Sequence, residues 1–299
     1  MSNPTARQRA EELFRQAQES KQVLSALRLA EEAAAADPTL PGVNGMRAEC
    51  LARMGRIHEA LVVVDLEIDN AVNAEPAKQL RQDLLSMKAQ HDAHSQHERQ
   101  WASVLTPAMI HPIEMATHRY HYRGHAMIKN PFDMALYPML LWNLKPATIF
   151  EIGSYNGTSA LWMADQMATY GVDTQVHSLD IVAVTAIQHP KVHFYAGSGR
   201  ELDRVFPAEF IESCPRPFLV IEDADHTYET SIAVLNHFHP HMRPDEYFVI
   251  EDGLTSDGPR NAITEFIPAH PEYAVDSYYC DFFGYNSTWC INGFIKRVG

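Results

Sequence analysis

The chain has 299 residues, enough to bury a large core and to form two domains, because single domains commonly hold about 100 to 200 residues. It carries 24 basic and 38 acidic residues, a formal net charge of −14, and no Lys/Arg cluster offsets this charge. We therefore exclude nucleic acid and anionic membrane as expected partners. The N-terminus is polar, and no apolar run approaches the roughly 20 residues of a membrane helix, so we expect a cytoplasmic protein without membrane insertion.

The cysteines and histidines give no metal-binding pattern. The four cysteines have neither CxxC nor zinc-ligand spacing, which favours reduced thiols. Two groups of histidines are closely spaced: His91, His94 and His97, and His237, His239 and His241. The first group lies in a polar stretch and the second straddles a proline, so we interpret both as solvated surface side chains.

Residues 6 to about 90 predict helices only, because they are rich in Ala, Leu, Glu, Gln and Arg with helical periodicity. Two segments, 25–38 and 59–76, look alike, and their equivalent Ala26 and Ala60 are 60 − 26 = 34 residues apart. This period resembles that of tetratricopeptide repeats, although the characteristic early Trp and Tyr are missing. We therefore expect an all-α tetratricopeptide-like domain with its connector over residues 1–100.

So few helical hairpins cannot bury a continuous core by stacking alone. They must pack on the rest of the chain or on another subunit, which suggests a homo-oligomer and leaves open a protein partner. A generic helical cap is an equally good interpretation of this region.

Residues 101–299 predict an α/β domain, with a substrate or lid lead-in at about 111–135. The apolar run 147–152 reads as a buried strand and continues into Gly153-Ser154-Tyr155-Asn156-Gly157 and a helix. Glycines permit a tight strand-to-helix turn and close approach of backbone N–H groups to a ligand. Strand, glycine turn and helix form the opening of a doubly wound, Rossmann-like nucleotide-binding sheet.

Four further strands follow, at 176–180, 192–198, 218–222 and 246–250. The strand at 176–180 ends in Asp180, where an acid could bind ribose hydroxyls or instead cap a turn. Buried runs of this kind, alternating with helices such as 229–238, are typical of a parallel sheet.

Three acids are expected to meet at neighbouring strand ends. Asp223 follows one strand, and Glu251 and Asp252 follow the next, 251 − 223 = 28 residues later, which is enough for a connecting helix. Three carboxylates that close repel strongly unless a cation joins them, and all-oxygen ligands select a hard ion such as Mg²⁺. A solvated acid cluster is the alternative.

His226 and Asp225 lie just beyond Asp223. His226 is well placed as a general base, because its ordinary pKa lies near working pH, although it could simply be a satisfied histidine. Asp225 could act as a base, orient His226 or serve as another metal ligand. By strand alternation Glu222 should point away from this group, so its substitution should be milder than that of Asp223.

The glycine turn resembles motif I of class I S-adenosylmethionine-dependent methyltransferases. That resemblance places Glu151, Gly153, Tyr155 and Gly157 against the methionine part of the cofactor. By the same analogy Asp180 binds the ribose, and Gly197 and Ser198 lie near the adenine.

Several segments together look like the cephalosporin hydroxylase family, which has this fold and includes sugar O-methyltransferases. They are Tyr122-Arg123-Gly124, Lys129-Asn130-Pro131-Phe132-Asp133, Glu222-Asp223-Ala224-Asp225-His226 and Ile250-Glu251-Asp252-Gly253. The Asp-x-x-His followed by Glu-Asp is similar to Mg²⁺-dependent O-methyltransferases of macrolide sugars, in which the acids bind metal and the His takes the proton.

This resemblance also predicts an antiparallel C-terminal hairpin from strands at 273–279 and 288–296, joined by a Gly/Asn turn. Its aromatic residues, including Phe282, Phe283 and Tyr285, could line the acceptor pocket or pack at the edge of the sheet.

The sequence thus suggests an S-adenosylmethionine- and Mg²⁺-dependent O-methyltransferase acting on a hydroxyl of a sugar or glycosylated natural product. A metal-bound acceptor oxygen would be deprotonated by His226. Two rivals are a non-catalytic, cofactor-binding scaffold and a hydroxylase or other tailoring enzyme on the same fold. The sequence spacing shows no His-His-carboxylate iron triad that would favour the latter.

Overall fold

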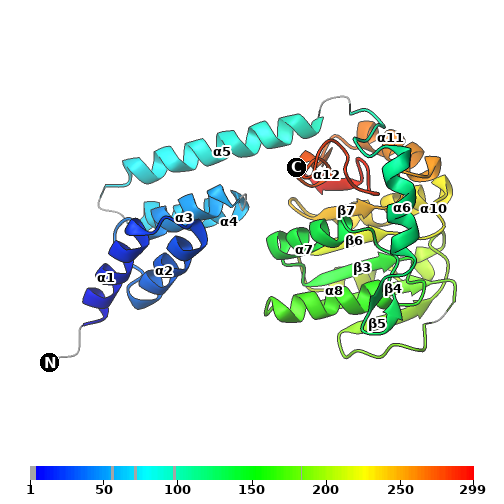
Figure 1. Ribbon diagram of the computed structural model, residues 1–299, viewed down its shortest axis with the longest axis horizontal. Coiled ribbons are helices and arrows are strands. Elements are labelled where there is room, and N and C mark those ends of the chain that lie inside the picture. Colours follow the sequence, from blue (N-terminus) through cyan, green and yellow to red (C-terminus); the bar gives the residue numbers. More distant parts are fainter. Residues whose placement is uncertain (1–4, 55–56, 71–72, 97–98, 183) are drawn as a thin grey trace. The chain divides into compact units, whose positions relative to one another are not determined.

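The computed structural model describes residues 5–54, 57–70, 73–96, 99–182 and 184–299 (Figure 1). The chain forms two compact units, Met1–His91 and Asp92–Gly299. The domain boundary near residue 100 stays a prediction. Within the described residues, no helix combines the length and the apolar character needed to cross a membrane.

The first unit consists of helices. They are α1 (Ala6–Glu19), α2 (Val23–Ala36), α3 (Val43–Arg53), α4 (Ile57–Asn70) and most of α5 (Glu75–Gln96), which continues past His91. α1 packs against α2, α2 against α3 and α3 against α4, around cores of Ala, Leu and Val side chains. The assignment of these helices to tetratricopeptide repeats stays a prediction.

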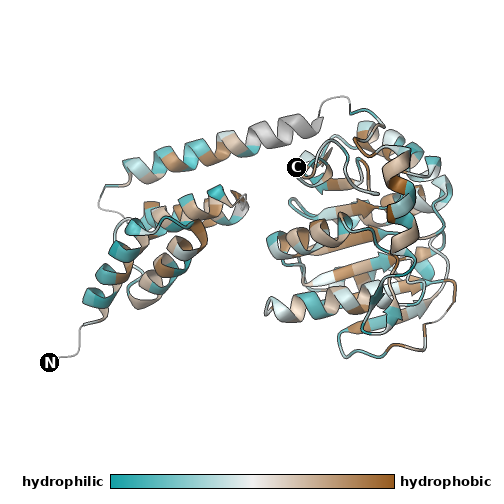
Figure 2. Ribbon diagram, viewed as in Figure 1, coloured by the Kyte–Doolittle hydropathy of each residue, from teal (hydrophilic) through white to brown (hydrophobic). Residues whose placement is uncertain are grey.

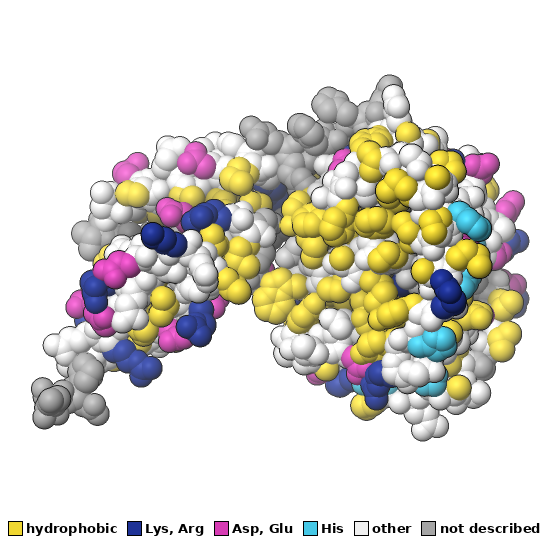
Figure 3. Space-filling model, in the orientation of Figure 1, with side chains coloured by type: hydrophobic (Ala, Val, Ile, Leu, Met, Phe, Trp, Pro, Cys, Tyr) yellow, Lys and Arg dark blue, Asp and Glu magenta, His cyan; other side chains and the backbone are white. Residues whose placement is uncertain are grey.

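Helix starts in this unit are fixed by side chains. Thr5 and Gln8 form a reciprocal capping box at the start of α1. The carboxylate of the buried Glu67 accepts hydrogen bonds from the backbone N–H groups of Gly42, Asn44 and Gly45 at the start of α3. A carboxylate satisfies otherwise unpaired N–H groups there and complements the positive end of the helix dipole. Basic and acidic side chains are interspersed on the surface of this unit (Figure 3).

The second unit is built on a seven-stranded sheet in the order β5-β4-β3-β6-β7-β9-β8. The strands are β3 (Thr148–Ile152), β4 (Gln175–Asp180), β5 (Val192–Ala196), β6 (Phe218–Glu222), β7 (Tyr247–Ile250), β8 (Tyr273–Val275) and β9 (Phe294–Arg297). β3 to β7 are parallel, and β9 runs antiparallel to both β7 and β8. The predicted α/β class and parallel sheet are confirmed, and the hydropathy colours show the apolar strands at its centre (Figure 2).

Helices and short elements surround this sheet. They are α6 (Pro107–Thr117), a small sheet of β1 (His121–Tyr122) and β2 (His125–Ala126), α7 (Asp133–Leu144), α8 (Thr158–Thr169), η1 (Leu202–Arg204), α9 (Ala208–Ser213), α10 (Tyr228–Phe238), η2 (His239–His241), α11 (Asp257–Ala269) and α12 (Ser277–Cys280).

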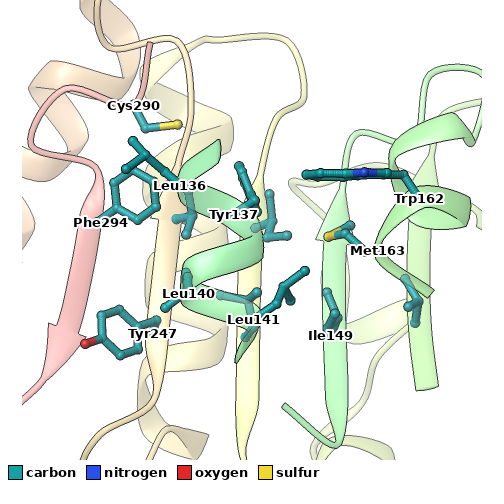
Figure 4. Packing of buried hydrophobic residues seen from close by; sticks show 14 of the residues in the cluster. Leu136, Tyr137, Leu140, Leu141, Ile149, Trp162, Met163, Tyr247, Cys290 and Phe294 are labelled. Carbon is teal, nitrogen blue, oxygen red and sulfur yellow. The ribbon is translucent and has the colours of Figure 1, made fainter. Parts of the chain in front are cut away.

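Two cores cover the two faces of the sheet. Because successive strand residues point to opposite faces, Ile149 packs with α7 and α8, whereas Phe150 packs with Phe206 and Phe238 on the other face. Figure 4 shows the first core, in which Leu140 and Leu141 of α7 and Trp162 and Met163 of α8 face the strands. Such burial of large apolar side chains contributes roughly 1.5–3 kcal/mol each to stability.

The order in which strands are added to the sheet reverses between β3 and β6. From β3 the chain proceeds outward through β4 and β5, and then returns to β6 on the other side of β3. In open α/β sheets, ligands bind outside the carboxyl ends of the strands at such a switch point. Gly153 and Asp223, the residues that follow β3 and β6, therefore lie where a ligand is expected.

Two predicted segments differ from the structure. The antiparallel pair at the C-terminus is present, but its strands are shorter than predicted and are not joined by a tight turn. β8 ends at Val275, because the side chain of Asp276 accepts a hydrogen bond from Tyr278 N–H and starts α12. The second difference is the end of the N-terminal helical region. The sequence predicts helices to about residue 90, whereas α5 continues to Gln96, since no Gly or Pro interrupts it after Pro76.

Candidate active site

A cavity of about 400 Å³ opens at the switch point of the sheet. Its lining combines the glycine turn after β3, the residues after β6 and β7, and polar side chains of α6. The lining residues are Glu114, Thr117, His118, Met127, Ile128, Lys129, Asn130, Gly153, Ser154, Tyr155, Asn156, Thr158, Ser159, Asp223, Ala224, His226, Glu251, Asp252, Thr255 and Trp289. Pockets of this size commonly hold small ligands.

The glycine turn depends on its two glycines. Gly153 has φ 109°, and a Cβ there would lie 1.9 Å from the backbone oxygen of Asp223. Gly157 has φ 83° at the start of α8, and a Cβ there would collide with Phe194 and Val184. Only glycine therefore fits both positions. The turn and the start of α8 form one wall of the cavity, where Ser154, Thr158 and Ser159 offer polar side chains to a ligand. The backbone N–H groups of Gly153 and Ser154 already donate to the backbone oxygen of Leu179.

Other residues predicted to contact the cofactor lie away from this wall. Glu151 is fully buried and accepts a hydrogen bond from Ser178 Oγ, and burial raises its pKa to about 7. Asp180 accepts hydrogen bonds from the N–H groups of Tyr155, at 2.7 Å, and Val182, at 3.3 Å. It therefore holds the glycine turn in place, which is the turn-capping alternative for this acid.

Gly197 and Ser198 follow β5, outside the residues that line the cavity. A Cβ on Gly197 would meet Val205 and Leu179, so this glycine serves close packing.

The acids Asp223, Glu251 and Asp252 do converge on the cavity, and a lysine lies among them. Lys129 Nζ donates to Asp223 Oδ2 at 2.6 Å and to Glu251 Oε1, and its side chain is only 5% exposed. Tyr137 OH also donates to Glu251 Oε1. One buried ammonium group thus bridges two of the three carboxylates.

Burial and this ion pairing act on the same groups in opposite directions. Burial raises the pKa of Asp223, Glu251 and Asp252, and the positive charge of Lys129 partly offsets that increase. Burial disfavours the ammonium form of Lys129, but the carboxylates of Asp223 and Glu251 raise its pKa well above the ordinary value. Lys129 therefore remains charged at neutral pH.

His226 lies at the rim of the same group, 38% exposed, with its Nδ1 3.3 Å from Asp252 Oδ2. Asp223, His226 and Asp252 each offer a ligand or acceptor atom within 4.8 Å of the others. His226 and Asp252 both have positive φ, 53° and 58°. Non-glycine residues in this region are strained, and such strain is often found at functional sites.

Asp225 and Glu222 point elsewhere. Asp225 Oδ1 accepts a hydrogen bond from Thr227 Oγ1 at 2.8 Å, and Oδ2 accepts one from Arg200 at 2.9 Å. The carboxylate that faces His226 is Asp252, so the structure assigns Asp225 to the surface of the loop. Glu222, the last residue of β6, is buried and accepts a hydrogen bond from Ser231 Oγ of α10. Its side chain therefore points away from the cavity, as strand alternation predicts.

The sequence predicts a substrate or lid lead-in at about 111–135 but no individual roles for the residues that precede α7. Asn130 Oδ1 accepts hydrogen bonds from the N–H groups of Phe132 and Asp133 and so fixes the start of this helix. Asp133 is fully buried and accepts hydrogen bonds from Thr288 Oγ1 and Trp289 N–H. The segment thereby aims Lys129 into the acids and holds Trp289 at the cavity. The sequence feature that could have indicated a buried lysine is the position of Lys129 directly after the apolar Ala126-Met127-Ile128.

The C-terminal aromatic residues were predicted either to line the acceptor pocket or to pack at the edge of the sheet. Trp289 lines the cavity, whereas Phe282 and Phe283 are each 46% exposed and pack on each other outside it. Phe283 also contacts Phe132.

Comparisons with known proteins converge on one family. The family described as Rhamnosyl O-methyltransferase/CmcI matches residues 114–298. The Rhamnosyl O-methyltransferase of Mycobacterium leprae is 25% identical over 67% of this chain and 98% of its own length. The protein of the same name from Mycobacterium tuberculosis strain H37Rv is 26% identical over 59% of this chain and 77% of its own length.

Solved structures of CmcI share the fold of the second unit. CmcI with Mg and SAM is 26% identical, with a TM-score of 0.50, and covers 61% of this chain and 78% of the CmcI chain. The apo form of CmcI gives 26% identity and a TM-score of 0.53 over 61% and 77%. The family resemblance predicted from the sequence segments is confirmed.

Proposed function

The chain belongs to the Rhamnosyl O-methyltransferase/CmcI family, and on this premise we propose that it is an S-adenosylmethionine- and Mg²⁺-dependent O-methyltransferase acting on a sugar hydroxyl, in a free sugar or a glycosylated natural product. The observation that carries the proposal is that Asp223, Glu251, Asp252 and His226 line the same cavity as the glycine turn.

The charge of this cluster fits a divalent cation. Asp223, Glu251 and Asp252 carry a formal −3 and Lys129 carries +1, so −3 + 1 = −2 remains in a largely buried site. Burying uncompensated charge is costly, and carboxylate oxygens are the ligands that Mg²⁺ prefers. The hydrogen bonds from Lys129 and Tyr137 both reach Oε1 of Glu251, so coordination through its Oε2 need not displace them. We assign these three acids as the ligands of Mg²⁺.

The glycine turn fits S-adenosylmethionine. Gly153 and Gly157 keep side chains out of the wall of the cavity, and Ser154, Thr158 and Ser159 add polar groups to it. Ser154, Thr158 and Ser159 would hold the amino-acid part of the cofactor, which when bound supplies the methyl group. Tyr155, which is 68% exposed at the mouth of the cavity, would cover the cofactor.

The reaction would form an O–CH₃ bond as the bond between that carbon and sulfur breaks, and it would release one proton from the acceptor hydroxyl. Mg²⁺, when bound, supplies a Lewis acid that lowers the pKa of a hydroxyl beside it. His226 accepts the proton at Nε2, because its Nδ1 faces Asp252. The carboxylate of Asp252, 3.3 Å from Nδ1, would stabilise the imidazolium that forms.

The acceptor would enter between the acids and α6. Glu114 and Thr117 of this helix and His118, which follows it, line the cavity and offer hydrogen-bonding groups. Such groups suit the several hydroxyls of a sugar ring, and they support the sugar as acceptor over a purely apolar alcohol.

Methyl transfer from labelled S-adenosylmethionine to a panel of glycosides and their free aglycones tests this proposal. We expect label in one or more glycosides and none in the matched aglycones. Label in none of the glycosides, with S-adenosylmethionine bound to the protein, would reject the proposed reaction. Label in the aglycones alone would reject the sugar as acceptor.

A further inference from the structure

A second group of metal-ligand side chains lies at the opposite end of the sheet. It consists of His239 in η2, His270 after α11 and Glu272 just before β8. Each of the three offers a ligand atom within 4.8 Å of the other two. Tyr273 pairs with Arg297, and Tyr247 pairs with the adjacent Lys296, so β8 begins level with the start of β7. The group is therefore near the amino ends of the strands, whereas Asp223 and Asp252 follow their carboxyl ends.

The spacing of the three groups matches metal ligation better than hydrogen bonding. Glu272 Oε1 lies 3.7 Å from His239 Nδ1 and 3.5 Å from His270 Nδ1. These separations are too long for good N–H···O hydrogen bonds. Two ligand atoms at about 2.0–2.1 Å from a tetrahedral Zn²⁺ are separated by about 3.3 Å. The two imidazole–carboxylate separations would reach that value by shifts of a few tenths of an ångström.

One nitrogen atom of the group lacks a hydrogen-bond partner. His239 Nδ1 is buried and has no hydrogen-bond partner among the described residues. A buried polar atom without a partner costs about 1–3 kcal/mol. A metal ion bound by Nδ1 would remove this cost.

The charged side chains near these three residues leave the site available to a cation. Arg297 lies nearby, and its positive charge opposes a cation. Its guanidinium, however, donates to the backbone oxygens of His239, Met242 and Gly299. His237 and His241 face other acids, Asp203 and Glu212, so they are not members of the group.

We propose that His239, His270 and Glu272 bind a first-row transition-metal ion, with Zn²⁺ as the expected occupant. Two imidazoles and one carboxylate suit Zn²⁺ and leave its fourth position to solvent. The bound ion ties the end of α10, the end of α11 and the start of β8 together. Because the site is remote from the glycine turn, its role is structural and independent of methyl transfer.

The sequence does not predict this site, because its ligands are far apart along the chain. His239 and His270 are 270 − 239 = 31 residues apart, and the local set of His237, His239 and His241 suggested surface histidines. Only the packing of η2 against the end of α11 brings the two imidazoles together, with ring centroids 4.2 Å apart.

The test is titration of the metal-stripped full chain with Zn²⁺ and, separately, with Co²⁺, whose visible absorption reports tetrahedral nitrogen and oxygen ligands. We expect His270→Ala and Glu272→Gln to weaken Zn²⁺ binding by at least about tenfold and to abolish the tetrahedral Co²⁺ spectrum. Glu272→Gln preserves the shape of the side chain and so guards against misfolding. Zn²⁺ should also raise the Tm of the wild type and not that of Glu272→Gln, because a ligand stabilises only the fold that binds it.

His226→Ala is the matched control, since it removes one imidazole from the acid cluster at the other end of the sheet. It should retain the tetrahedral Co²⁺ spectrum. Loss of that spectrum in His226→Ala together with its retention in His270→Ala would place the ion in the acid cluster and overturn the proposal. Equal Zn²⁺ affinity of the wild type, His270→Ala and Glu272→Gln would overturn it as well.

Discussion

The two ends of the central sheet hold side-chain clusters of different composition. At the carboxyl ends of β6 and β7, three carboxylates surround one buried lysine, and the lysine is only 5% exposed. At the amino ends, two imidazoles face one carboxylate, and Glu272 is 28% exposed. The first cluster keeps a formal charge of −2, whereas the second has one carboxylate and two imidazoles and so carries a formal −1 when the imidazoles are in the neutral form that binds a metal ion.

This difference teaches why one sheet can select two kinds of ion. A negatively charged group of oxygen ligands favours a hard ion such as Mg²⁺, whose charge the site requires. Imidazole nitrogens favour a borderline ion such as Zn²⁺ through the ligand type itself. The charge of Lys129 is central to the first case, because it sets how much positive charge the acids still need.

Asp223→Asn should have the largest effect, because it removes one proposed ligand and one unit of negative charge from the carboxyl end. We expect kcat/KM to fall by roughly 10³-fold, equivalent to about 4 kcal/mol of transition-state stabilisation. S-adenosylmethionine binding should persist, and calorimetry of Mg²⁺ and cofactor binding would check both expectations. Asp225→Asn is the matched control, two residues away and outside the cavity, and should lose less than about tenfold. Equal losses in both variants would contradict the assignment.

Lys129→Met removes the buried cation and leaves Asp223 and Glu251 without their partner. Breaking a buried ion pair in this way costs about 3–5 kcal/mol, so the unfolding free energy in EDTA should fall strongly. Mg²⁺ should restore part of this loss. The increase in unfolding free energy on adding Mg²⁺ should be larger for the variant than for the wild type, because the cluster of the variant carries −3. Denaturant unfolding with and without Mg²⁺ measures the difference. A variant as stable as the wild type in EDTA would show that Lys129 does not balance these acids.

His226→Ala should reduce kcat by roughly 10²-fold or more, the contribution typical of a general base. Binding of S-adenosylmethionine and Mg²⁺ should change little. The residual activity should rise more steeply with pH than that of the wild type, since hydroxide must then take the proton. Retention of the wild-type rate and pH profile would exclude His226 as the base.

Glu222→Gln should have the smallest effect on activity, less than about tenfold, because this buried acid points away from the cavity. Burial raises its pKa from 4.5 to about 7, so the folded state holds a proton that the unfolded state has lost between these values. The stability of the wild type therefore falls as pH rises from about 4.5 to about 7, and Glu222→Gln should weaken this dependence. Unfolding free energies across that range provide the check. An unchanged slope would contradict the role of Glu222.

The sequence was most informative where local pattern determines structure. The continuous apolar runs identified β3 and β6, and the glycines after β3 indicated the tight turn that Gly153 makes against Asp223. The acids followed from the same reasoning, because parallel strands place their carboxyl ends at one edge of the sheet.

Side chains brought in from a distance had no such pattern. Lys129 comes from a segment 94 residues before Asp223, and nothing in its immediate sequence specifies that partner. The direction of Asp225 was also beyond strand alternation, because the loop after β6 turns through the positive φ of His226. The same limit concealed His239, His270 and Glu272.

The Mg²⁺ dependence of methyl transfer by the wild-type chain tests the central claim most directly. The rate is measured with labelled S-adenosylmethionine and a glycoside acceptor in EDTA, and again after Mg²⁺ is added in excess. The charge of the acid cluster predicts loss of methyl transfer in EDTA and recovery with Mg²⁺. A full rate in EDTA would contradict the assignment of Asp223, Glu251 and Asp252 as ligands of a required ion.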